Sequence, residues 1–293
     1  MIEVMAAAGV VTVQDGGRPG WMHQGVAPGG ALAPALLARA NVAAGNAPCA
    51  AALEVVGRIV VKARGDRVVA TDDGASRALA DGDTFEVSCG RARVRYLAVH
   101  GGLDVPVVLG SRSTLLVAGL GGHLGRVLRR GDTLPCCHPE RSDCCHPERS
   151  DCCHPERSEG SPPGPVGTAE GEAVPDLDAP VCILPGPDVE RFAPDALDVL
   201  LSSTFTVSPR SDRVGVRLVG PPLARSGDDA GGSAPMVRGA LQVPSGGEPI
   251  LLGPDHPTTG GYPVLATVVS ADVGAVMARP VGSPVRFALW TRK

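Results

Sequence analysis

The sequence predicts a mainly β protein with a few short helices. Its 293 residues include 39 glycines and 28 prolines, whereas aromatic residues make up only 3%. Glycine and proline mark tight turns, so this composition is typical of many short elements joined by turns. Several short apolar runs are rich in β-branched side chains, which favours buried strands. The length of 293 residues predicts one large or two medium domains, and an apolar content of 43% is enough to form their cores.

Strands around one helix are expected in the amino-terminal half. Residues 10–14 alternate like a strand, and the Asp15-Gly16 pair after them predicts a hairpin turn. Residues 34–44 predict a helix, because Pro34 suits a first helical turn, whereas Ala33 in front is a poor N-cap. Further short strands are expected at residues 58–62, 66–71, 84–88 and 93–99.

The carboxy-terminal half also favours strands and short helices. Helical turns are expected at residues 188–192 and 194–201, where Pro194 suits the first helical turn. Ser270 is expected to cap a helix at residues 271–278. Strands are expected at residues 181–184, 204–208, 236–244, 249–253, 264–269 and 284–290.

Charge and apolar patterning argue against several functions. The formal charge of −4 does not indicate a nucleic-acid-binding protein. Residues 1–5 do not resemble a signal peptide, and no window reaches the roughly 20 apolar residues that span a bilayer. We therefore expect a soluble cytoplasmic protein. The glycines at residues 119–125 lack the spacing of a dinucleotide-binding loop, and no P-loop motif occurs.

An eight-residue repeat interrupts the chain. The unit Cys-Cys-His-Pro-Glu-Arg-Ser-Asp occupies residues 136–143 and 144–151 and recurs from residue 152 with Glu159 in the last position. Three Cys-Cys-His clusters raise the alternative of a zinc or copper site, but adjacent cysteines lack the spacing of zinc ribbons. We predict no metal site and interpret residues 136–179 as a disordered, low-complexity insertion and Pro/Gly-rich linker. The cysteines outside the repeat are interpreted as buried thiols: Cys49, Cys89 and Cys182.

The most distinctive polar loop is Asp-His-Pro-Thr-Thr-Gly-Gly-Tyr-Pro at residues 255–263, between two predicted buried strands. Glycine lets backbone N–H groups turn toward one point, and such a nest binds anionic oxygen. The alternative is a tight Gly-Pro turn with a structural tyrosine. The candidate substrate-binding residues of this loop are Thr258, Thr259, Gly260 and Tyr262.

Arginine recurs in three other polar turns. Its guanidinium grips carboxylate or phosphate through two parallel hydrogen bonds, so each turn is a candidate anion pocket. The alternative for each is a solvated turn or an ion pair that closes on itself. Gln242, inside an apolar run, must find polar partners or a ligand. The candidates are Gln14, Asp15 and Arg18 in the first turn, Ser111, Arg112 and Ser113 in the second, and Ser211, Asp212 and Arg213 in the third.

Five motifs occur in an order that resembles one known family. They are Thr-Val-Gln-Asp-Gly-Gly-Arg-Pro-Gly at 12–20, Tyr-Leu-Ala-Val-His-Gly-Gly at 96–102, Leu-Gly-Ser-Arg-Ser-Thr at 109–114, Ser-Pro-Arg-Ser-Asp-Arg at 208–213 and Thr-Thr-Gly-Gly-Tyr-Pro at 258–263. Outside roughly residues 136–178, the chain resembles the allophanate hydrolase subunit 2 family, also called the biotin-dependent carboxyltransferase or KipA/PxpC family. It departs from the family pattern at Gly29 and Ala33, where the family usually has Ser and Asp, and at His256-Pro257, where it tends to have Arg-Gln.

The resemblance implies two cyclophilin-like β-barrel halves, at residues 1–135 and 180–293, and a partner of the subunit 1 (KipI/PxpB) family. Members contribute to ATP-dependent 5-oxoprolinase, which opens 5-oxoproline to glutamate with a third protein of the PxpA (LamB/YcsF) type. Close relatives form the carboxyltransferase part of urea carboxylase, which uses biotin on a carrier. We expect a PxpC-like component of a 5-oxoprolinase that shares ATP with its partners. The alternatives are a carboxyltransferase, with biotin on a separate carrier, and a non-catalytic KipA-like regulator of a kinase-inhibitor partner.

The candidate residues suit a reaction that develops negative charge beside a small amide, because arginines and backbone N–H groups stabilise such charge. Those expected to grip the anion are Arg18, Arg112 and Arg213, and those expected to donate to it are Thr258, Thr259 and Gly260. Asp15 or Asp212 is expected to orient the substrate. These turns are therefore expected to converge on one small anionic guest, with Asp15, Arg18, Asp212 and Arg213 as the catalytic set.

Overall fold

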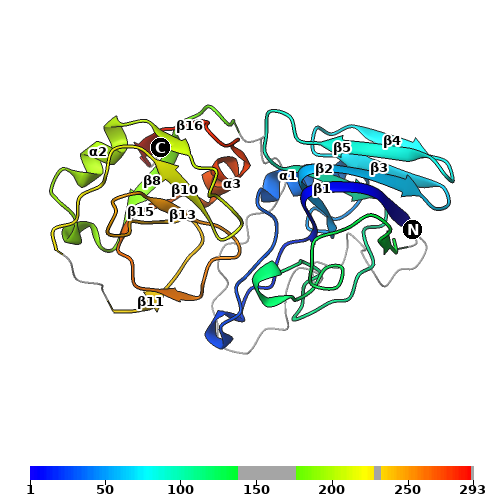
Figure 1. The fold of residues 1–293 in the computed structure, drawn as a ribbon, viewed down its shortest axis with the longest axis horizontal. Coiled ribbons are helices and arrows are strands. Elements are labelled where there is room, and N and C mark those ends of the chain that lie inside the picture. The colour runs from blue at the N-terminus through cyan, green and yellow to red at the C-terminus, as the bar shows by residue number, and fades with distance from the viewer. Residues whose placement is uncertain (138–175, 228–231, 292–293) are drawn as a thin grey trace. The chain divides into compact units, whose positions relative to one another are not determined.

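The computed structural model describes residues 1–137, 176–227 and 232–291 (Figure 1). The chain divides into two compact units: a first unit of Met1–Trp21 and Pro28–Val174, and a second unit of Met22–Ala27 and Pro175–Lys293. Most of the repeat and linker expected at residues 136–179 lies outside the described residues. No helix in the described ranges has the length and apolar character needed to cross a membrane.

A seven-stranded sheet, curved as a half-barrel, forms the first unit. The strand order is β4-β3-β6-β2-β1-β7, and β5 also pairs with β2. The strands are β1 (Ile2–Gln14), β2 (Ala52–Ala63), β3 (Arg67–Thr71), β4 (Ser76–Leu79), β5 (Thr84–Ser88), β6 (Arg95–Val99) and β7 (Thr133–Leu134). Apolar side chains of these strands form one buried core, and α1 (Pro34–Ala43) packs against β3 and β6. A short 3-10 helix, η2 (Leu116–Ala118), lies in the loops that follow β6.

The two longest strands, β1 and β2, place a pair of glycines opposite each other. Gly9 and Gly57 face each other in the antiparallel register. A Cβ atom on Gly57 would lie 2.2 Å from the carbonyl oxygen of Ala8, and one on Gly9 would lie 2.2 Å from that of Val56. Because no side chain fits in that space, glycine is required at both positions.

An eight-stranded sheet forms the second unit, in the order β16-β9-β10-β13-β12-β15-β8-β17. Its strands are β8 (Val181–Pro185), β9 (Phe205–Val207), β10 (Gly215–Val219), β12 (Ala240–Gln242), β13 (Ile250–Leu252), β15 (Val264–Val268), β16 (Pro284–Val285) and β17 (Phe287–Leu289). A separate short ladder joins β11 (Ala234–Pro235) to β14 (Thr259–Gly260). The helices of this unit are α2 (Ala196–Ser202), α3 (Ser270–Ala278) and the 3-10 turns η1 (Met22–Gln24) and η4 (Val189–Arg191).

The eight-stranded sheet curls into a nearly closed barrel. β16 and β17 lie at opposite ends of its strand order, yet only Arg286 separates them in sequence. β16 pairs antiparallel with β9, whereas β17 pairs parallel with β8. Consecutive residues can reach both edges only if the sheet bends until those edges meet.

The structure confirms the prediction of a mainly β chain with few helices and corrects several elements. The hairpin expected after Gln14 is wrong, because β1 pairs with β2, which begins 38 residues later at Ala52. Ser270 does not cap α3: the cap position is Val269, and the helix has no side-chain capping bond. The helical turn expected at residues 188–192 is only the short 3-10 turn at Val189–Arg191. The strand expected at residues 284–290 is divided into β16 and β17.

The three cysteines outside the repeat are not fully buried thiols as predicted. Each lies in an intermediate environment. Cys89 and Cys182 are free thiols, and burial raises the pKa of both. Cys49 is disulfide-bonded. None of these groups therefore resembles an activated nucleophile, which requires a lowered thiol pKa.

Candidate functional site

Asp15 organises a cluster of loops in the first unit. It directly follows β1, and its carboxylate accepts hydrogen bonds from the Gly17 amide (2.8 Å), the Ser111 hydroxyl (2.6 Å) and the Arg112 amide (2.5 Å). The Ser113 hydroxyl is a fourth donor to the same carboxylate. An ionised carboxylate accepts about four hydrogen bonds, so these donors occupy most of its capacity. The structure thus brings the first and second predicted turns together through Asp15.

The segment that carries the second turn contains a strained residue. Val108 and Ser111 exchange two backbone hydrogen bonds across Leu109-Gly110, and both central residues have positive φ, 53° and 79°. That pairing requires a two-residue turn of the I′ kind, which favours Asn-Gly rather than leucine. The strain therefore lies directly before Ser111, and backbone strain of this kind clusters at functional sites.

Arg18 is buried beneath the same loops, with 1% of its surface exposed. Its guanidinium donates to the carbonyl oxygens of Val108 (3.4 Å) and Ser113. Gly121, one of the glycines at residues 119–125, packs on it, since a Cβ on Gly121 would lie 2.8 Å from Nη2. These contacts give Arg18 a structural position, and its grip on an external anion remains a prediction.

Gln14 and Arg112 occupy the two sides of this cluster. Gln14 is fully buried and donates from Nε2 to the Thr12 hydroxyl and the Thr114 carbonyl, both at 3.0 Å. The Arg112 side chain is 21% exposed and donates to the Val105 carbonyl (2.9 Å) and Asp104 (3.2 Å). Gln14 therefore supports the loops, whereas Arg112 reaches the surface.

A buried ion pair is the centre of the corresponding cluster in the second unit. Arg213 Nε and Nη2 donate to the two carboxylate oxygens of Asp255, at 2.8 and 3.0 Å. Their side chains are 8% and 2% exposed. Buried ion pairs persist only with good geometry, and this pair has the bidentate geometry that arginine and carboxylate favour. The pair joins the third predicted turn to the loop at residues 255–263.

The rest of that loop is ordered by backbone pairing and by Gln242. Thr259 and Gly260 form β14, and Thr259 is exposed. Gln242 is buried and donates from Nε2 to the carbonyl oxygen of Tyr262 (3.3 Å), so its amide finds a protein partner. A Cβ on Gly260 would lie 3.3 Å from that same nitrogen. Thr258 lies at an intermediate depth, and the Tyr262 side chain is exposed.

Asp212 and Ser211 close their own turn. The Asp212 carboxylate accepts from the Val214 amide (2.9 Å) and the Gly215 amide (3.1 Å). The Ser211 hydroxyl accepts from the Arg217 amide (3.1 Å). These contacts match the alternative of a turn that bonds to itself. The roles of both residues toward a substrate remain predictions.

His256 lies beside the buried ion pair and is 1% exposed. Its Nδ1 is 2.8 Å from the Pro257 carbonyl, so Nδ1 carries the proton in that contact. Burial, with the positive charge of Arg238, lowers the pKa of the imidazole. The side chain is therefore neutral near pH 7.

The described residues contain no group of three or more histidine, cysteine, aspartate or glutamate side chains arranged to hold a metal ion. The Cys-Cys-His repeat lies largely outside those residues, so the prediction that it binds no metal is still a prediction.

Comparison with known proteins identifies the family. Residues 24–289 match the family model described as carboxyltransferase domain, subdomain A and B. The chain belongs to this carboxyltransferase-domain family. This confirms the family predicted from the five sequence motifs.

Two curated relatives match this carboxyltransferase-domain chain almost from end to end. The C subunit of the Escherichia coli 5-oxoprolinase is 33% identical over 305 residues, which cover 98% of this chain and 90% of that protein. The C subunit of the Haemophilus influenzae 5-oxoprolinase is 30% identical with the same coverage. The urea amidolyase of Saccharomyces cerevisiae is 29% identical, but the match covers only 16% of that protein.

Solved structures share the carboxyltransferase-domain fold. TTHA0988 is 30% identical with a TM-score of 0.77, covering 98% of this chain and 55% of that one. The urea amidolyase of Kluyveromyces lactis is 26% identical with a TM-score of 0.78, covering 99% of this chain and 19% of that one. The chain thus spans about half of TTHA0988 and about a fifth of the amidolyase.

Several polar residues that order this carboxyltransferase-domain chain were not among the predicted site residues. Asp255 and His256 lie inside the predicted loop, but the bidentate partner of Arg213 was not recognised. Glu54 and Tyr96 were also missed. A glutamate inside the apolar run of residues 53–56 was the available signal, because a buried carboxylate needs donors.

Proposed function

We propose that this chain is the PxpC-like component of an ATP-dependent 5-oxoprolinase, which opens 5-oxoproline to glutamate. The observation that carries the proposal is the 33% identity to the C subunit of a 5-oxoprolinase over 98% of this chain and 90% of that protein. The two urea amidolyase relatives match over only 17% and 16% of their length. They therefore support similarity to one domain of those proteins and not to the whole proteins.

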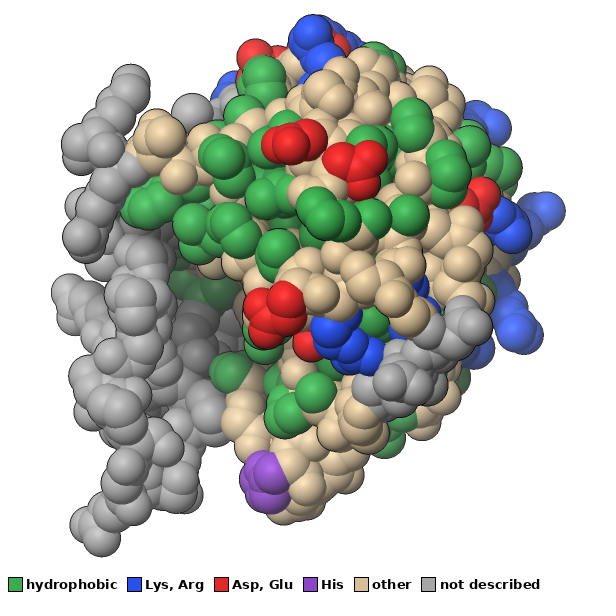
Figure 2. Space-filling view, turned by 90° about the vertical axis from the view of Figure 1, so that its left-hand side faces the viewer, with side chains coloured by type: hydrophobic (Ala, Val, Ile, Leu, Met, Phe, Trp, Pro, Cys, Tyr) green, Lys and Arg blue, Asp and Glu red, His purple; other side chains and the backbone are tan. Residues whose placement is uncertain are grey.

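The proposal includes partners, because the matched relatives are named as subunits. We propose a KipI/PxpB-type subunit 1 protein as the direct partner, a PxpA-type protein as the third component, ATP as the shared nucleotide and the cytoplasm as the location. Exposed apolar side chains support a partner, since extended apolar surface marks interaction sites. Figure 2 shows hydrophobic side chains gathered on one face. In the described part of the second unit the large exposed apolar residues are Leu184, Val219, Val237, Tyr262, Val281, Leu289 and Trp290.

The proposed chemistry is stabilisation of the anionic oxygen that develops as the amide reacts. Arg112 is the candidate arginine most accessible to a substrate, with a side chain 21% exposed, against 8% for Arg213. Its backbone amide is held by the Asp15 carboxylate. Positioned donors of this kind stabilise developing charge without reorganising, and loss of one costs about 100- to 1,000-fold in rate. We therefore assign anion contact first to Arg112.

The test is reconstitution. The chain is combined with its subunit 1 and PxpA-type partners, and glutamate formation from 5-oxoproline is measured with and without ATP. ATP-dependent glutamate is the expected result. Arg112→Ala should lower turnover, whereas Arg58→Ala, which removes an exposed arginine from a surface ion pair, should not. A complete complex that forms no glutamate contradicts the proposal, and Arg112→Ala with unchanged turnover removes that residue from it.

A carboxyltransferase activity is the second candidate, favoured by the family description and the amidolyase relatives. It requires a biotinylated carrier. Transfer of labelled carboxylate from carboxybiotin to urea, in place of glutamate formation, would establish this alternative.

A further inference from the structure

We propose that Glu54, with Tyr96, is a positioning residue that sets the geometry of the Asp15 cluster. The effect on turnover rests on the proposed function, whereas the effect on loop geometry does not. Neither Glu54 nor Tyr96 belongs to the site predicted from the sequence.

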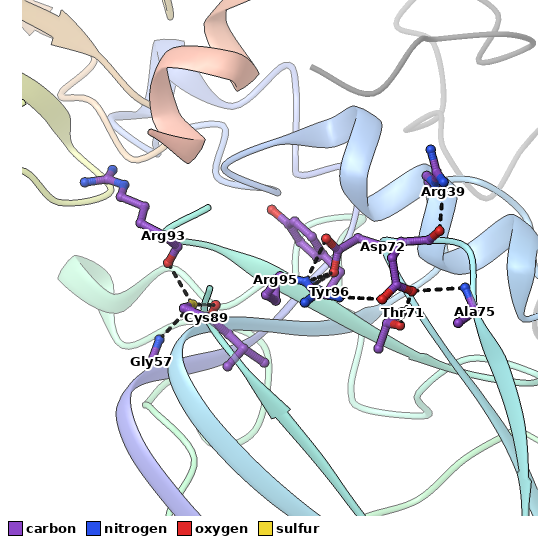
Figure 3. Close-up of polar contacts among 11 residues, drawn as sticks. Arg39, Gly57, Thr71, Asp72, Ala75, Cys89, Arg93, Arg95 and Tyr96 are labelled. Carbon is purple, nitrogen blue, oxygen red and sulfur yellow. Dashed lines mark hydrogen bonds and ion pairs between the residues drawn. The ribbon is translucent and has the colours of Figure 1, made fainter. Parts of the chain in front are cut away.

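The first observation is a buried carboxylate on β2 that lies outside the apolar core of the sheet. Glu54 is 1% exposed and Tyr96 is fully buried. They are direct cross-strand partners in β2 and β6. The Tyr96 hydroxyl donates to Glu54 Oε2 at 2.6 Å. The Tyr96 amide in turn donates to Asp72 at 2.8 Å, as Figure 3 shows, so the tyrosine is fixed from both ends.

The second observation is that this pair binds the loop before α1. The Leu32 amide donates to Glu54 Oε2 at 2.7 Å, and the Ala33 amide donates to the Tyr96 hydroxyl at 3.0 Å. Ala33 is the N-cap of α1 and has no side-chain capping bond. The amide of the N-cap residue needs an acceptor, and the Tyr96 hydroxyl supplies it, while Glu54 binds the residue before the helix.

The third observation is that the same loop packs against the Asp15 turn. The Ala31 amide donates to the Asp15 carbonyl at 3.1 Å, and the Arg18 amide donates to the Pro28 carbonyl at 2.7 Å. A Cβ on Gly17 would lie 2.8 Å from the Pro28 carbonyl oxygen, so the two backbones touch. The loop at residues 28–33 is therefore held between Glu54 on one side and the Asp15 turn on the other.

The contacts form a continuous path. Glu54 holds Leu32, the neighbouring Ala31 holds the Asp15 backbone, and the Asp15 carboxylate holds Ser111 and the Arg112 amide. Loss of the carboxylate at residue 54 frees the loop and moves the Asp15 turn. Small displacements of catalytic groups cost up to about 100-fold in rate.

The test compares Glu54→Gln, Glu54→Asp and Tyr96→Phe with Glu86→Gln, a control at an exposed carboxylate on β5. Backbone amide exchange is followed by NMR in the isolated full chain, and kcat and KM are measured in the reconstituted complex. For Glu54→Gln we expect faster exchange at Leu32, Ala31 and Arg18, and a fall in kcat of between about 10- and 100-fold with KM changed less than kcat. Glu54→Asp should recover part of kcat, and Glu86→Gln should match the wild type.

Faster exchange confined to Leu32 and Ala33, with unchanged kcat, would show that Glu54 only holds the residues before α1 and would overturn the proposal. If the wild-type complex has no turnover, the proposed function fails, but exchange at Arg18 still decides whether Glu54 positions the turn. If a variant is too unstable to assay, unchanged exchange at Arg18 in the milder Tyr96→Phe variant overturns the proposal.

Discussion

At the scale of single residues, the Arg213–Asp255 pair combines two charges that are expensive to bury separately. Asp255→Ala leaves a buried guanidinium without its bidentate partner, so we expect the free energy of unfolding to fall by about 3–5 kcal/mol. Denaturant unfolding measures it. Glu248→Ala is the control, because the Arg210–Glu248 pair is 65% and 45% exposed and such pairs contribute at most about 1 kcal/mol. Equal losses in both variants would contradict this account.

Asp132 is a second residue whose charge state follows from its contacts. Hydrogen bonds from the Arg126 side chain, outweighing burial, lower the pKa of its carboxyl to about 2. A lowered carboxyl pKa stabilises the fold above the ordinary value near 3.9, and that contribution is lost as pH falls toward about 2. We expect the pKa of Asp132, measured by NMR titration, to be higher in the Arg126→Gln variant than in the wild type.

Arg129→Gln is the matched control for this titration. Arg129 reaches Asp132 through its backbone amide, at 2.8 Å, so replacing its side chain should leave the titration unchanged. A pKa of Asp132 near 3.9 in the wild type would show that the Arg126–Asp132 ion pair does not form in solution.

At the scale of elements, the Leu109-Gly110 turn carries a leucine in a left-handed conformation. That conformation costs a non-glycine residue about 1–2 kcal/mol, and asparagine tolerates it better. We expect Leu109→Asn to raise the thermal midpoint, measured by circular dichroism. Val107→Asn, which replaces a neighbour 56% exposed, should change it little. A lower midpoint for Leu109→Asn would mean that leucine packing outweighs the strain.

Closure of the second unit's sheet depends on β17. Phe287 packs edge-on against Phe205 of β9, with ring centroids 6.1 Å apart. Phe287→Ala removes a buried aromatic ring, and we expect a loss of about 3–5 kcal/mol in denaturant unfolding. Leu289→Ala on the same strand, 45% exposed, should cost less than about 1 kcal/mol. A small loss for Phe287→Ala would argue that β17 is not needed for closure.

At the scale of the whole molecule, the Cys-Cys-His repeat has the composition of a metal site without the spacing of one. We expect purified protein to hold well below one zinc per chain by elemental mass spectrometry. EDTA should leave the thermal midpoint unchanged. Chelation lowers the midpoint only where a structural zinc contributes folding free energy. Stoichiometric zinc, with a lower midpoint after chelation, would contradict this prediction.

Much of the fold follows from local pattern. The helix at Pro34–Ala43 and the strands at 250–252 and 264–268 were predictable because turn residues bound each run and apolar side chains fill it. The pairing of β1 was not predictable, because its partner is β2, which begins 38 residues later and does not form a hairpin with it. The same holds for the site: the motifs identified the turns, whereas the donors to Asp15 from residues 111–113 lie 96 to 98 residues away.

The sequence by itself determined the mainly β class, the family and the turns that carry polar side chains, because these depend on residue type, local spacing and motif order. Only the tertiary structure decided that Asp15 holds the Ser111–Ser113 turn, that Asp255 neutralises Arg213 and that Glu54 of β2 holds the loop before α1. The physical reason is that a buried or half-buried carboxylate binds the donors that folding places around it, and sequence spacing does not show which donors those are.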